Sequence, residues 1–523
     1  MLAWCYNPSA FIQSISQQIA NQSMKIRDCG RFKRLNIVIL LLAFFVAVPA
    51  TIVAQTESHD PRVFNEQGNR ALFLKKYDLA IESYTKVIEL DPRFENAYFN
   101  RGYAKHHKGD YKGAIEDFNK ALEQNPKDLQ SIVSRADSNV ALGKSDLAFQ
   151  DYNKALELDA KYSDAYANRG VLRYRLGDNK GAFEHINKAI ELAPNVPLLY
   201  YNRAVWYNAA GDYPNVIKDC DKAIRLDPVY ADAYHERAVA QIRSGNRIPA
   251  LQDLNRAIEL DATRSLFYIN RGGVYRDLKS YDLALDDYRK SIELNPRFAP
   301  AYIGRGSVLF LQNDKAGAIK DFDKALELTP NDALARFNRG NWYADAGEYD
   351  KAWADYDIAI YSFKNYVAAY SARANAKYNL GLWQKSLSDY RESLKQDPKN
   401  DYLRLRIWLV RARIGESKAA TDELQIFLKT GTKPDQNPWS LKLARFLVGD
   451  ITEDELFKAI GQGDSEKTPE RRCEAYFYAG TLRLINGDNK TASQYFQKTL
   501  STNIKNFTEY QSAVAELKRL ERK

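Results

Sequence analysis

Small apolar residues recur along this chain at a fixed spacing of 34 residues. A first small residue keeps this step ten times, and a second one, usually alanine, follows twelve positions later in each unit. The first set is Gly68, Gly102, Ala136, Gly170, Ala204, Ala238, Gly272, Gly306, Gly340 and Ala374. A period of this size is typical of a stacked repeat array, in which each unit buries its apolar face against its neighbours. The pattern favours an extended surface over an enzyme with one pocket.

Residues 95–128 illustrate the unit. Apolar periodicity predicts one helix over about 96–108 and a second over about 112–124. Gly109 ends the first helix, because glycine tolerates the left-handed conformation of a helix stop. Pro126 follows the second helix, which proline cannot continue. The unit is therefore a helical hairpin, and the fold class is all-α.

Aromatic residues recur beside the small ones on both helices. On the first helix they include Tyr98, Tyr166, Tyr200, Tyr234, Tyr268, Tyr302 and Tyr370, and on the second Tyr84, Phe118, Tyr152, Tyr288, Phe322, Tyr356 and Tyr390. Over residues 61–400 this pattern resembles the tetratricopeptide repeat (TPR) family. The resemblance implies antiparallel helix pairs stacked into a right-handed superhelical solenoid of about 12–13 repeat units. It also implies that the first helices line a concave groove.

Arginine precedes the small residue in nine units, and an acidic residue stands sixteen positions after the arginine in eight of them. The pairs are Arg101/Asp117, Arg135/Asp151, Arg203/Asp219, Arg237/Asp253, Arg271/Asp287, Arg305/Asp321, Arg339/Asp355 and Arg373/Asp389, whereas Arg169 faces His185. Because the two positions can face each other in an antiparallel hairpin, we expect structural salt bridges. The alternative is a basic strip for anionic ligands.

The pattern weakens after residue 400. Residues 401–506 read as degenerate, irregular TPR-like units, with Trp408 in place of the small residue. Residues 507–523 read as a capping helix with Tyr510, Val514, Leu517 and Leu520 turned inward. The closing segment, EAYFYAGTLRLINGDNKTASQYFQKTL followed by NFTEY, resembles the new lipoprotein I family of exported bacterial TPR proteins. That resemblance would imply a periplasmic adaptor, although no cysteine for lipid attachment follows the apolar run near the N-terminus.

Residues 1–54 have the pattern of a signal sequence or a membrane anchor. A basic stretch over 25–34 precedes an unbroken apolar run over 37–48, and Met24 begins a better-proportioned signal than Met1. The segment 35–54 is also long enough to span a bilayer. Cleaved or retained, this segment predicts export of the repeats to the periplasm or the extracellular space, with membrane contact only through the apolar segment.

Composition excludes several other classes of function. The net charge of +9 is not gathered into basic clusters with exposed aromatics, so we expect no nucleic-acid partner. The five histidines and the cysteines have no metal-ligand spacing, and phosphate loops and nucleophile motifs are missing. Cys220 stands where an aromatic usually sits, which predicts a buried side chain. We therefore predict no catalytic residues, no metal and no cofactor.

The TPR resemblance places five positions of each first helix in the groove: three and two residues before the small residue, and one, four and five after it. Among these positions we expect a peptide-binding set rich in asparagine, which both donates and accepts hydrogen bonds, and in aromatic residues. The set is Phe99, Asn100, Tyr103, His106, Asn168, Tyr174, Tyr201, Asn202, Asn270, Phe310, Phe337, Asn338 and Tyr378. His107 occupies a groove position as well. A competing interpretation is that the aromatics pack against the adjacent repeat.

The sequence thus favours a non-enzymatic scaffold that binds protein or peptide segments in the cell envelope. The alternatives are a membrane-anchored TPR receptor or assembly factor, an enzyme with an accessory array, and a structural spacer. No non-repeat segment after residue 54 is long enough for a catalytic domain.

Overall fold

A computed structural model describes residues 60–430, 438–461, 467–505 and 507–522, which form 27 helices and no strand. The predicted signal or anchor over 1–54 lies outside these residues. Of the helices described, none is both long enough and apolar enough to cross a membrane. The chain divides into two compact units at Ser244 and Gly245, and we describe each unit by itself.

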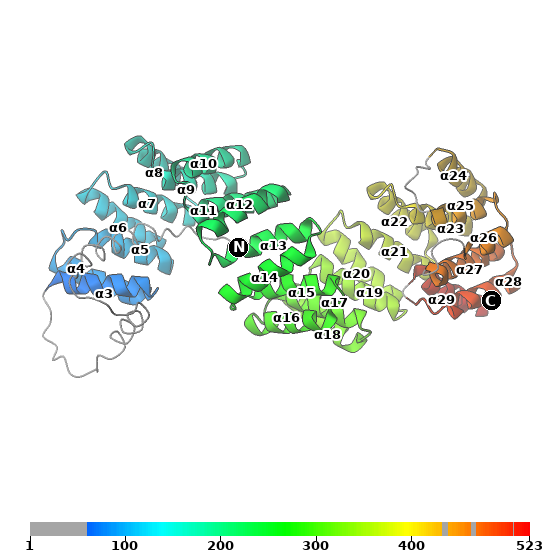
Figure 1. Ribbon diagram of the computed structural model, residues 1–523. Coiled ribbons are helices and arrows are strands. Elements are labelled where there is room, and N and C mark those ends of the chain that lie inside the picture. Colours follow the sequence, from blue (N-terminus) through cyan, green and yellow to red (C-terminus); the bar gives the residue numbers. More distant parts are fainter. Residues whose placement is uncertain (1–59, 431–437, 462–466, 506, 523) are drawn as a thin grey trace, which may run out of the picture. The chain divides into compact units, whose positions relative to one another are not determined.

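The first unit consists of consecutive helices that pack in antiparallel pairs (Figure 1). They are α3 (Pro61–Phe73), α4 (Tyr77–Leu90), α5 (Ala97–Lys108), α6 (Tyr111–Gln124), α7 (Leu129–Ala141), α8 (Ser145–Leu158), α9 (Ser163–Arg175), α10 (Asn179–Leu192), α11 (Pro197–Ala209), α12 (Tyr213–Leu226) and α13 (Ala231–Arg243).

The second unit continues the same pairing and ends in a less regular part. Its helices are α14 (Arg247–Leu260), α15 (Ser265–Asp277), α16 (Tyr281–Leu294), α17 (Ala299–Leu311), α18 (Lys315–Leu328), α19 (Ala333–Asp345), α20 (Tyr349–Ser362), α21 (Val367–Asn379), α22 (Trp383–Gln396), α23 (Asp401–Arg413), α24 (Ser417–Thr430), α25 (Pro438–Val448), α26 (Glu453–Ala459), α27 (Thr468–Ile485), α28 (Asn489–Ser501) and α29 (Thr508–Glu521). The predicted all-α fold of paired helices, typical of a TPR solenoid, is confirmed.

The turn inside each hairpin has one residue in the left-handed region. Such a residue recurs every 34 positions from Lys75 (φ 56°) to Gly449 (φ 85°), and nine of the twelve are glycine. The three others are Lys75, Lys279 and Asn313. Glycine is favoured here because it adopts positive φ without a steric penalty. The recurrence shows that the hairpin geometry continues into α25 and α26, where the sequence pattern is weak.

The small residues bring the two helices of a hairpin into close contact. A Cβ atom added to Gly102 would lie 2.9 Å from Cε1 of Phe118 on the facing helix, which is too close for any real side chain. The second small position is as tight, since Ala80, Ala114 and Ala148 are fully buried. The aromatic rings of the second helices therefore fill the space that the small residues leave. Cys220 is buried and free of a disulfide, as predicted.

The predicted salt bridges form in all seven Arg/Asp pairs whose two residues lie in the same compact unit. In each pair the Nε and Nη2 atoms of the arginine donate to the two carboxylate oxygens of the aspartate over 2.6–3.0 Å. The aspartates are almost completely buried. Two parallel bonds to one carboxylate are the strongest arrangement available to a guanidinium.

Every arginine of this set except Arg305 also reaches back to the preceding repeat, a bond that the spacing of sixteen residues does not predict. The Nη1 atom of Arg135 donates to Oδ1 of Asn119 at 2.6 Å, and Arg271 binds Asn255 in the same way at 2.8 Å. Equivalent bonds join Arg101 to Thr85, Arg169 to Asn153, Arg203 to Asn187, Arg237 to Asp221, Arg339 to Asp323 and Arg373 to Asp357. The arginine therefore links three helices from two repeats.

The hairpin of α9 and α10 departs from this arrangement, because His185 replaces the aspartate. Nη2 of Arg169 lies 2.7 Å from Nε2 of His185, and the other ring nitrogen lies 2.6 Å from the carbonyl oxygen of Gly181. Nε of Arg169 is buried and has no hydrogen-bond partner. Burial, together with the positive charge of Arg169, lowers the pKa of His185.

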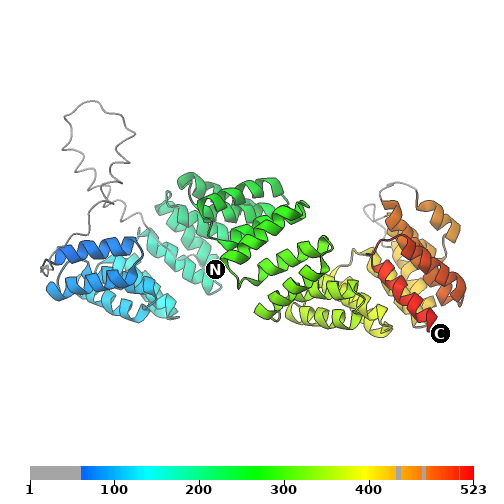
Figure 2. The same ribbon diagram turned by 90° about the horizontal axis from the view of Figure 1, so that it is seen from below.

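The C-terminal part of the second unit has the largest apolar core of the described residues. Trp408, at the place of the small residue, is buried there and donates from Nε1 to Oγ1 of Thr421 at 3.1 Å. This unit therefore packs differently, as expected. Helix α29 covers the core and packs along α28, α27 and α21; in Figure 2 it is the red helix that ends at the C-terminus.

The inward face expected for α29 was wrong in part. The buried residues of α29 are Glu509, Ser512, Ala513, Ala515 and Glu516. By contrast, the expected Tyr510, Val514, Leu517 and Leu520 are only half-buried, although both leucines contact the apolar core. The physical reason is the surface beneath the helix, which presents the guanidinium groups of Arg406 and Arg413 and therefore selects carboxylates.

We predict that Asp287→Ala lowers the free energy of unfolding by about 1–3 kcal/mol, because it leaves the half-buried guanidinium of Arg271 without its two acceptors. The matched control is Asp286→Ala, which removes an exposed partner of Arg289 and should change stability by less than about 0.5 kcal/mol. Urea unfolding of both variants measures the difference. Equal losses would show that the Arg271 pair adds no more than a surface pair.

We predict that His185→Asp stabilises the protein by about 1–2 kcal/mol, because it supplies Arg169 with the carboxylate that its counterparts have. The pKa of His185 is lowered in the folded state, so the wild type loses stability as the pH falls below about 6.5. The gain should therefore be larger at pH 5 than at pH 7.5 in thermal unfolding. Asp219→His, the reverse change in the next hairpin, should be destabilising; a gain there would refute the explanation.

Candidate binding groove

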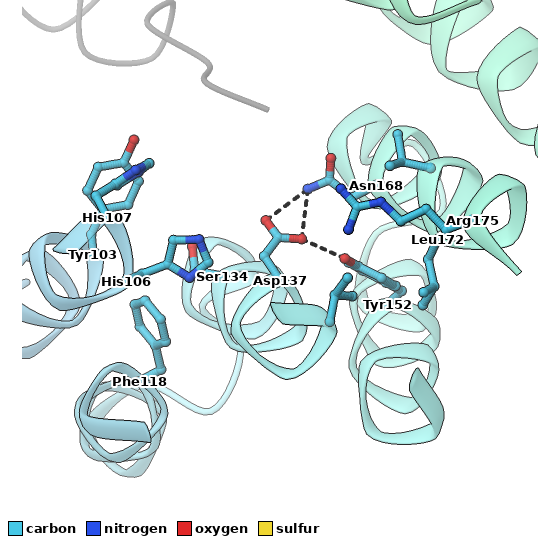
Figure 3. Close-up of a pocket in the computed structure, with 12 residues that line it drawn as sticks. Tyr103, His106, His107, Phe118, Ser134, Asp137, Tyr152, Asn168, Leu172 and Arg175 are labelled. Atoms are coloured by element: carbon cyan, nitrogen blue, oxygen red, sulfur yellow. Dashed lines mark hydrogen bonds between the residues drawn. The ribbon is translucent and has the colours of Figure 1, made fainter. Parts of the chain in front are cut away.

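A pocket lies across three successive first helices of the first unit, α5, α7 and α9 (Figure 3). Three of the predicted groove residues meet in it: Tyr103 and His106 from α5, and Asn168 from α9. The complete lining is Tyr103, His106, His107, Phe118, Ser134, Asp137, Val140, Tyr152, Asn168, Val171, Leu172 and Arg175. An apolar wall with a few convergent polar groups is the usual composition of a ligand site.

Asp137, which was not among the predicted site residues, lies at the centre of this pocket in Figure 3. Its carboxylate accepts a hydrogen bond from the hydroxyl of Tyr152 at 2.5 Å and one from Nδ2 of Asn168 at 3.1 Å. Burial raises the pKa of Asp137 to about 6, and the two hydrogen bonds oppose this shift only in part. The carboxyl group is therefore poised to change its charge between about pH 5 and pH 7.

The bond between Asp137 and Tyr152 belongs to a periodic set. In this set, the groove residue that directly follows the small residue accepts a hydrogen bond from a tyrosine fifteen positions later, on the second helix. The pairs are Asn69/Tyr84, Asp137/Tyr152, Asn341/Tyr356 and Asn375/Tyr390. Tyr103 and Ser307 stand at the same groove position opposite Phe118 and Phe322, which have no hydroxyl. The matching of Asn or Asp with Tyr is the sequence signal that would have found Asp137.

Two histidines form one end of the pocket. Nδ1 of His106 lies 2.8 Å from Oγ of Ser138, and the ring of His107 stacks on Tyr77 with centroids 5.8 Å apart. His107 also contacts Tyr103 edge to face, at 4.3 Å. Burial, with a smaller contribution from His107, lowers the pKa of His106 to about 4. The pKa of His107 is lowered as well, chiefly by burial, so the charged form of both rings is disfavoured in this aromatic cluster.

Other predicted aromatic residues pack within the array. Tyr174 stacks on Trp206 of the next first helix with centroids 4.8 Å apart, and Tyr201 lies 5.2 Å from Tyr230. Phe337 contacts Tyr366 at 4.9 Å in the same manner. All three rings remain half-buried, so they carry packing contacts between repeats and also keep some surface. Phe99, which packs on Phe118, and Phe310 are likewise half-buried.

The predicted asparagines are less available than expected. Nδ2 of Asn168 is bonded to Asp137, and Nδ2 of Asn338 donates to Oγ of Ser307 at 3.2 Å. Asn202 is buried, whereas Asn100 and Asn270 are half-buried. One amide proton of Asn168 and of Asn338 therefore connects neighbouring first helices rather than facing a ligand.

Tyr378 was predicted to face a ligand directly, but in the structure it is not open to solvent. Its side chain is completely buried, and its hydroxyl donates to Oε1 of Glu516 on α29 at 2.8 Å. The TPR resemblance places this position on the groove face. However, the chain's own C-terminal helix covers it. Asn375, one turn earlier, also faces α29, where it contacts Thr508.

The pocket contains no arrangement that would hold a metal ion. Among the residues that the structure describes, no three His, Cys, Asp or Glu side chains gather as a metal site requires. The polar groups of the pocket are suited instead to hydrogen bonding with a peptide backbone or with a polar side chain.

Antiparallel helix hairpins repeated every 34 residues, with small residues and aromatics at fixed places, define an α-helical repeat protein. Family models for the tetratricopeptide repeat match residues 95–128, 163–196 and 265–298, and a TPR repeat model matches 68–109, 136–177 and 306–347. The chain therefore contains tetratricopeptide repeats over these segments.

Several solved structures are similar to this chain. Yeast Tom70 is 18% identical, with 77% of this chain and 97% of that chain covered and a TM-score of 0.39. A TPR protein from Parabacteroides merdae is 19% identical, with 48% and 98% covered and a TM-score of 0.37. MamA is 24% identical, with 31% and 94% covered and a TM-score of 0.28. Similarity at this level supports no statement about what this chain binds.

The pocket generates a prediction on pH. Because the pKa of His106 is about 4 in the folded state and about 6.5 in the unfolded state, the wild type should lose stability relative to His106→Gln as the pH falls from 6.5 to 4, by up to roughly 3 kcal/mol. The pKa of Asp137 is raised, so the wild type should lose stability relative to Asp137→Asn as the pH rises from about 4 to 6. Chemical unfolding across this range measures both slopes, and slopes of the same sign would contradict the described pocket.

Proposed function

We propose that this chain is a non-enzymatic scaffold that binds a protein segment in the groove of its first helices, at the pocket on α5, α7 and α9. The observation that carries the proposal is the convergence of Tyr103, His106 and Asn168 in one pocket although they are up to 65 residues apart. TPR repeats occur in proteins that bind protein or peptide partners, which agrees with this site.

The chemistry of the pocket indicates the kind of segment that fits. Val140, Val171 and Leu172 offer an apolar wall, and Tyr103 and His107 offer aromatic faces. Asp137 and Arg175 add one acidic and one basic side chain at the same place. An extended or helical segment with an apolar anchor and flanking polar groups matches this composition. A carboxylate clamp of lysines, as some chaperone-binding TPR domains use, is not built here: Phe99, Val133, Ala167, Tyr201 and His235 stand at the corresponding places.

We further propose that the scaffold acts outside the cytoplasm, in the cell envelope. The support is the N-terminal sequence, with its basic stretch and apolar run, and the likeness of the closing segment to the new lipoprotein I family. A retained apolar segment would make the chain a membrane-anchored receptor or assembly factor instead.

We predict that Tyr103→Ala and Val140→Asp each abolish capture of the partner from an envelope extract, because both change the wall of the pocket. The control is Leu79→Ala, which truncates an exposed side chain on the second helix α4 and should leave capture unchanged. A photo-reactive amino acid at His107 should cross-link to the captured partner, whereas the same group at Glu116, exposed on α6, should not. Capture that survives both pocket variants would refute the proposed site.

We predict that the mature protein begins between Thr51 and Thr56, which N-terminal sequencing of protein recovered from its natural source will reveal. Recovery of the uncleaved chain in the membrane fraction would establish the anchored alternative. Recovery of the uncleaved chain from the cytoplasm would refute export.

A further inference from the structure

Helix α29 lies on groove positions of the second unit, and its buried face is polar. Glu509, Ser512 and Glu516 are buried there with two alanines, while its larger apolar side chains are only half-buried. A helix that merely closes an apolar core would turn its leucines inward. The polar residues on the buried face of α29 must therefore have partners on the surface that this helix covers.

That surface presents two arginines with a matching spacing. Arg406 and Arg413 lie seven residues apart on α23, as Glu509 and Glu516 do on α29. Nη1 of Arg406 lies 3.8 Å from Oε1 of Glu509, and Nη2 of Arg413 lies 3.1 Å from Oε2 of Glu516. Between the two ion pairs, Arg406 donates to Oγ of Ser512 at 3.1 Å. Arg406 pairs with Glu509 and Arg413 with Glu516, in the same order along both helices, so α29 runs parallel to α23.

Helix α29 also packs along α28 and α27, where the hydroxyl of Tyr478 donates to Oε1 of Glu509 at 3.4 Å. Helix α21 supplies a further line of contacts. The hydroxyl of Tyr378 donates to Glu516, and Nη2 of Arg519 donates to the carbonyl oxygens of Tyr378 and Asn379 over 2.8 and 2.6 Å. These carbonyls belong to the last turn of α21, and that of Tyr378 also accepts from the backbone N–H of Gly381 at 2.9 Å, so Arg519 adds a second donor to it. The guanidinium of Arg519 also lies over the ring of Trp383, 4.8 Å from its centroid. Positions in the groove thus recognise α29 by charge, hydrogen bonds and register.

Such contacts select a matching helix more than they strengthen its binding. Removing carboxylates and guanidinium groups from water opposes the Coulombic attraction that they gain, so a buried ion pair gives little net stability. A helix that is covalently joined to its site needs little intrinsic affinity, since its effective concentration is in the millimolar range. A separate helix with the same pattern of charges can therefore compete for the site.

We propose that the surface formed by α21, α23, α27 and α28 is a binding site for an amphipathic helix with two glutamates seven residues apart and small residues between them. In the free chain α29 occupies this site, and a partner helix of the same pattern replaces it. The site is separate from the pocket on α5, α7 and α9, so the proposal stands independently of the function proposed above.

The test uses the full chain with a protease recognition sequence inserted after Ile504, and a labelled synthetic peptide with the sequence of residues 507–523 as the probe. Fluorescence anisotropy measures peptide binding before and after cleavage. We expect the intact chain to bind the peptide about 100-fold or more weakly than the cleaved chain does, because α29 competes at high effective concentration.

Specificity is tested by exchanging charges. A peptide with Glu516→Arg should fail to bind the cleaved chain and should bind a cleaved chain that carries Arg413→Glu. Tyr103→Ala, in the pocket of the first unit, is the matched control and should leave peptide binding unchanged. A loss of peptide binding in this control would contradict the separation of the two sites.

Three results would overturn the proposal. The first is equal binding of the peptide before and after cleavage, and the second is failure of the charge exchange to restore binding. The third is unfolding of the second unit upon cleavage, seen as a loss of helical circular dichroism, because α29 would then be an inseparable part of the core. Far-ultraviolet circular dichroism of the cleaved chain distinguishes this last result from simple loss of affinity.

Discussion

In most of the regular repeats one guanidinium group links three helices, and the regularity of the array depends on it. The arginine before the small residue binds the aspartate of its own second helix with two parallel bonds and an acceptor on the preceding second helix with a third. The donors of a guanidinium have fixed directions, so the packing inside one repeat and the packing between repeats are set together. The tyrosine three residues earlier adds an aromatic face, 5.7 Å from the guanidinium of Arg271 at Tyr268.

Two repeats, those of Arg169 and Arg305, lack part of this bonding and show what the guanidinium contributes. In the hairpin of α9 and α10, His185 satisfies Arg169 only in part, and a buried nitrogen is left without an acceptor. At Arg305 the place of the preceding acceptor holds Arg289, which cannot accept, and Arg305 keeps only its two bonds to Asp321. The array therefore tolerates the loss of one connection in a repeat, because the apolar contacts of the hairpin remain.

Much of the fold could be predicted from the sequence, because its determinants lie within one repeat. Periodicity located the helices, glycines located the turns, and the spacing of sixteen residues paired Arg271 with Asp287. The third bond of the arginine was missed because the acceptor varies between Asn, Asp and Thr and belongs to another repeat. Asp137 was missed for a similar reason: its partner Tyr152 was assigned only to the core. The burial of Tyr378 under α29 depends on a contact across 138 residues, which no local pattern contains.

The bond between a buried tyrosine and a groove side chain also bears on how such a protein can change during evolution. Where Tyr356 donates to Asn341, a replacement of the asparagine alone would strand a hydroxyl in the core, so the two residues must change together. Where Phe118 and Phe322 lie beneath Tyr103 and Ser307, the groove residue has no such tie. Divergence of the surface towards new partners is therefore least constrained in the repeats whose core ring is phenylalanine.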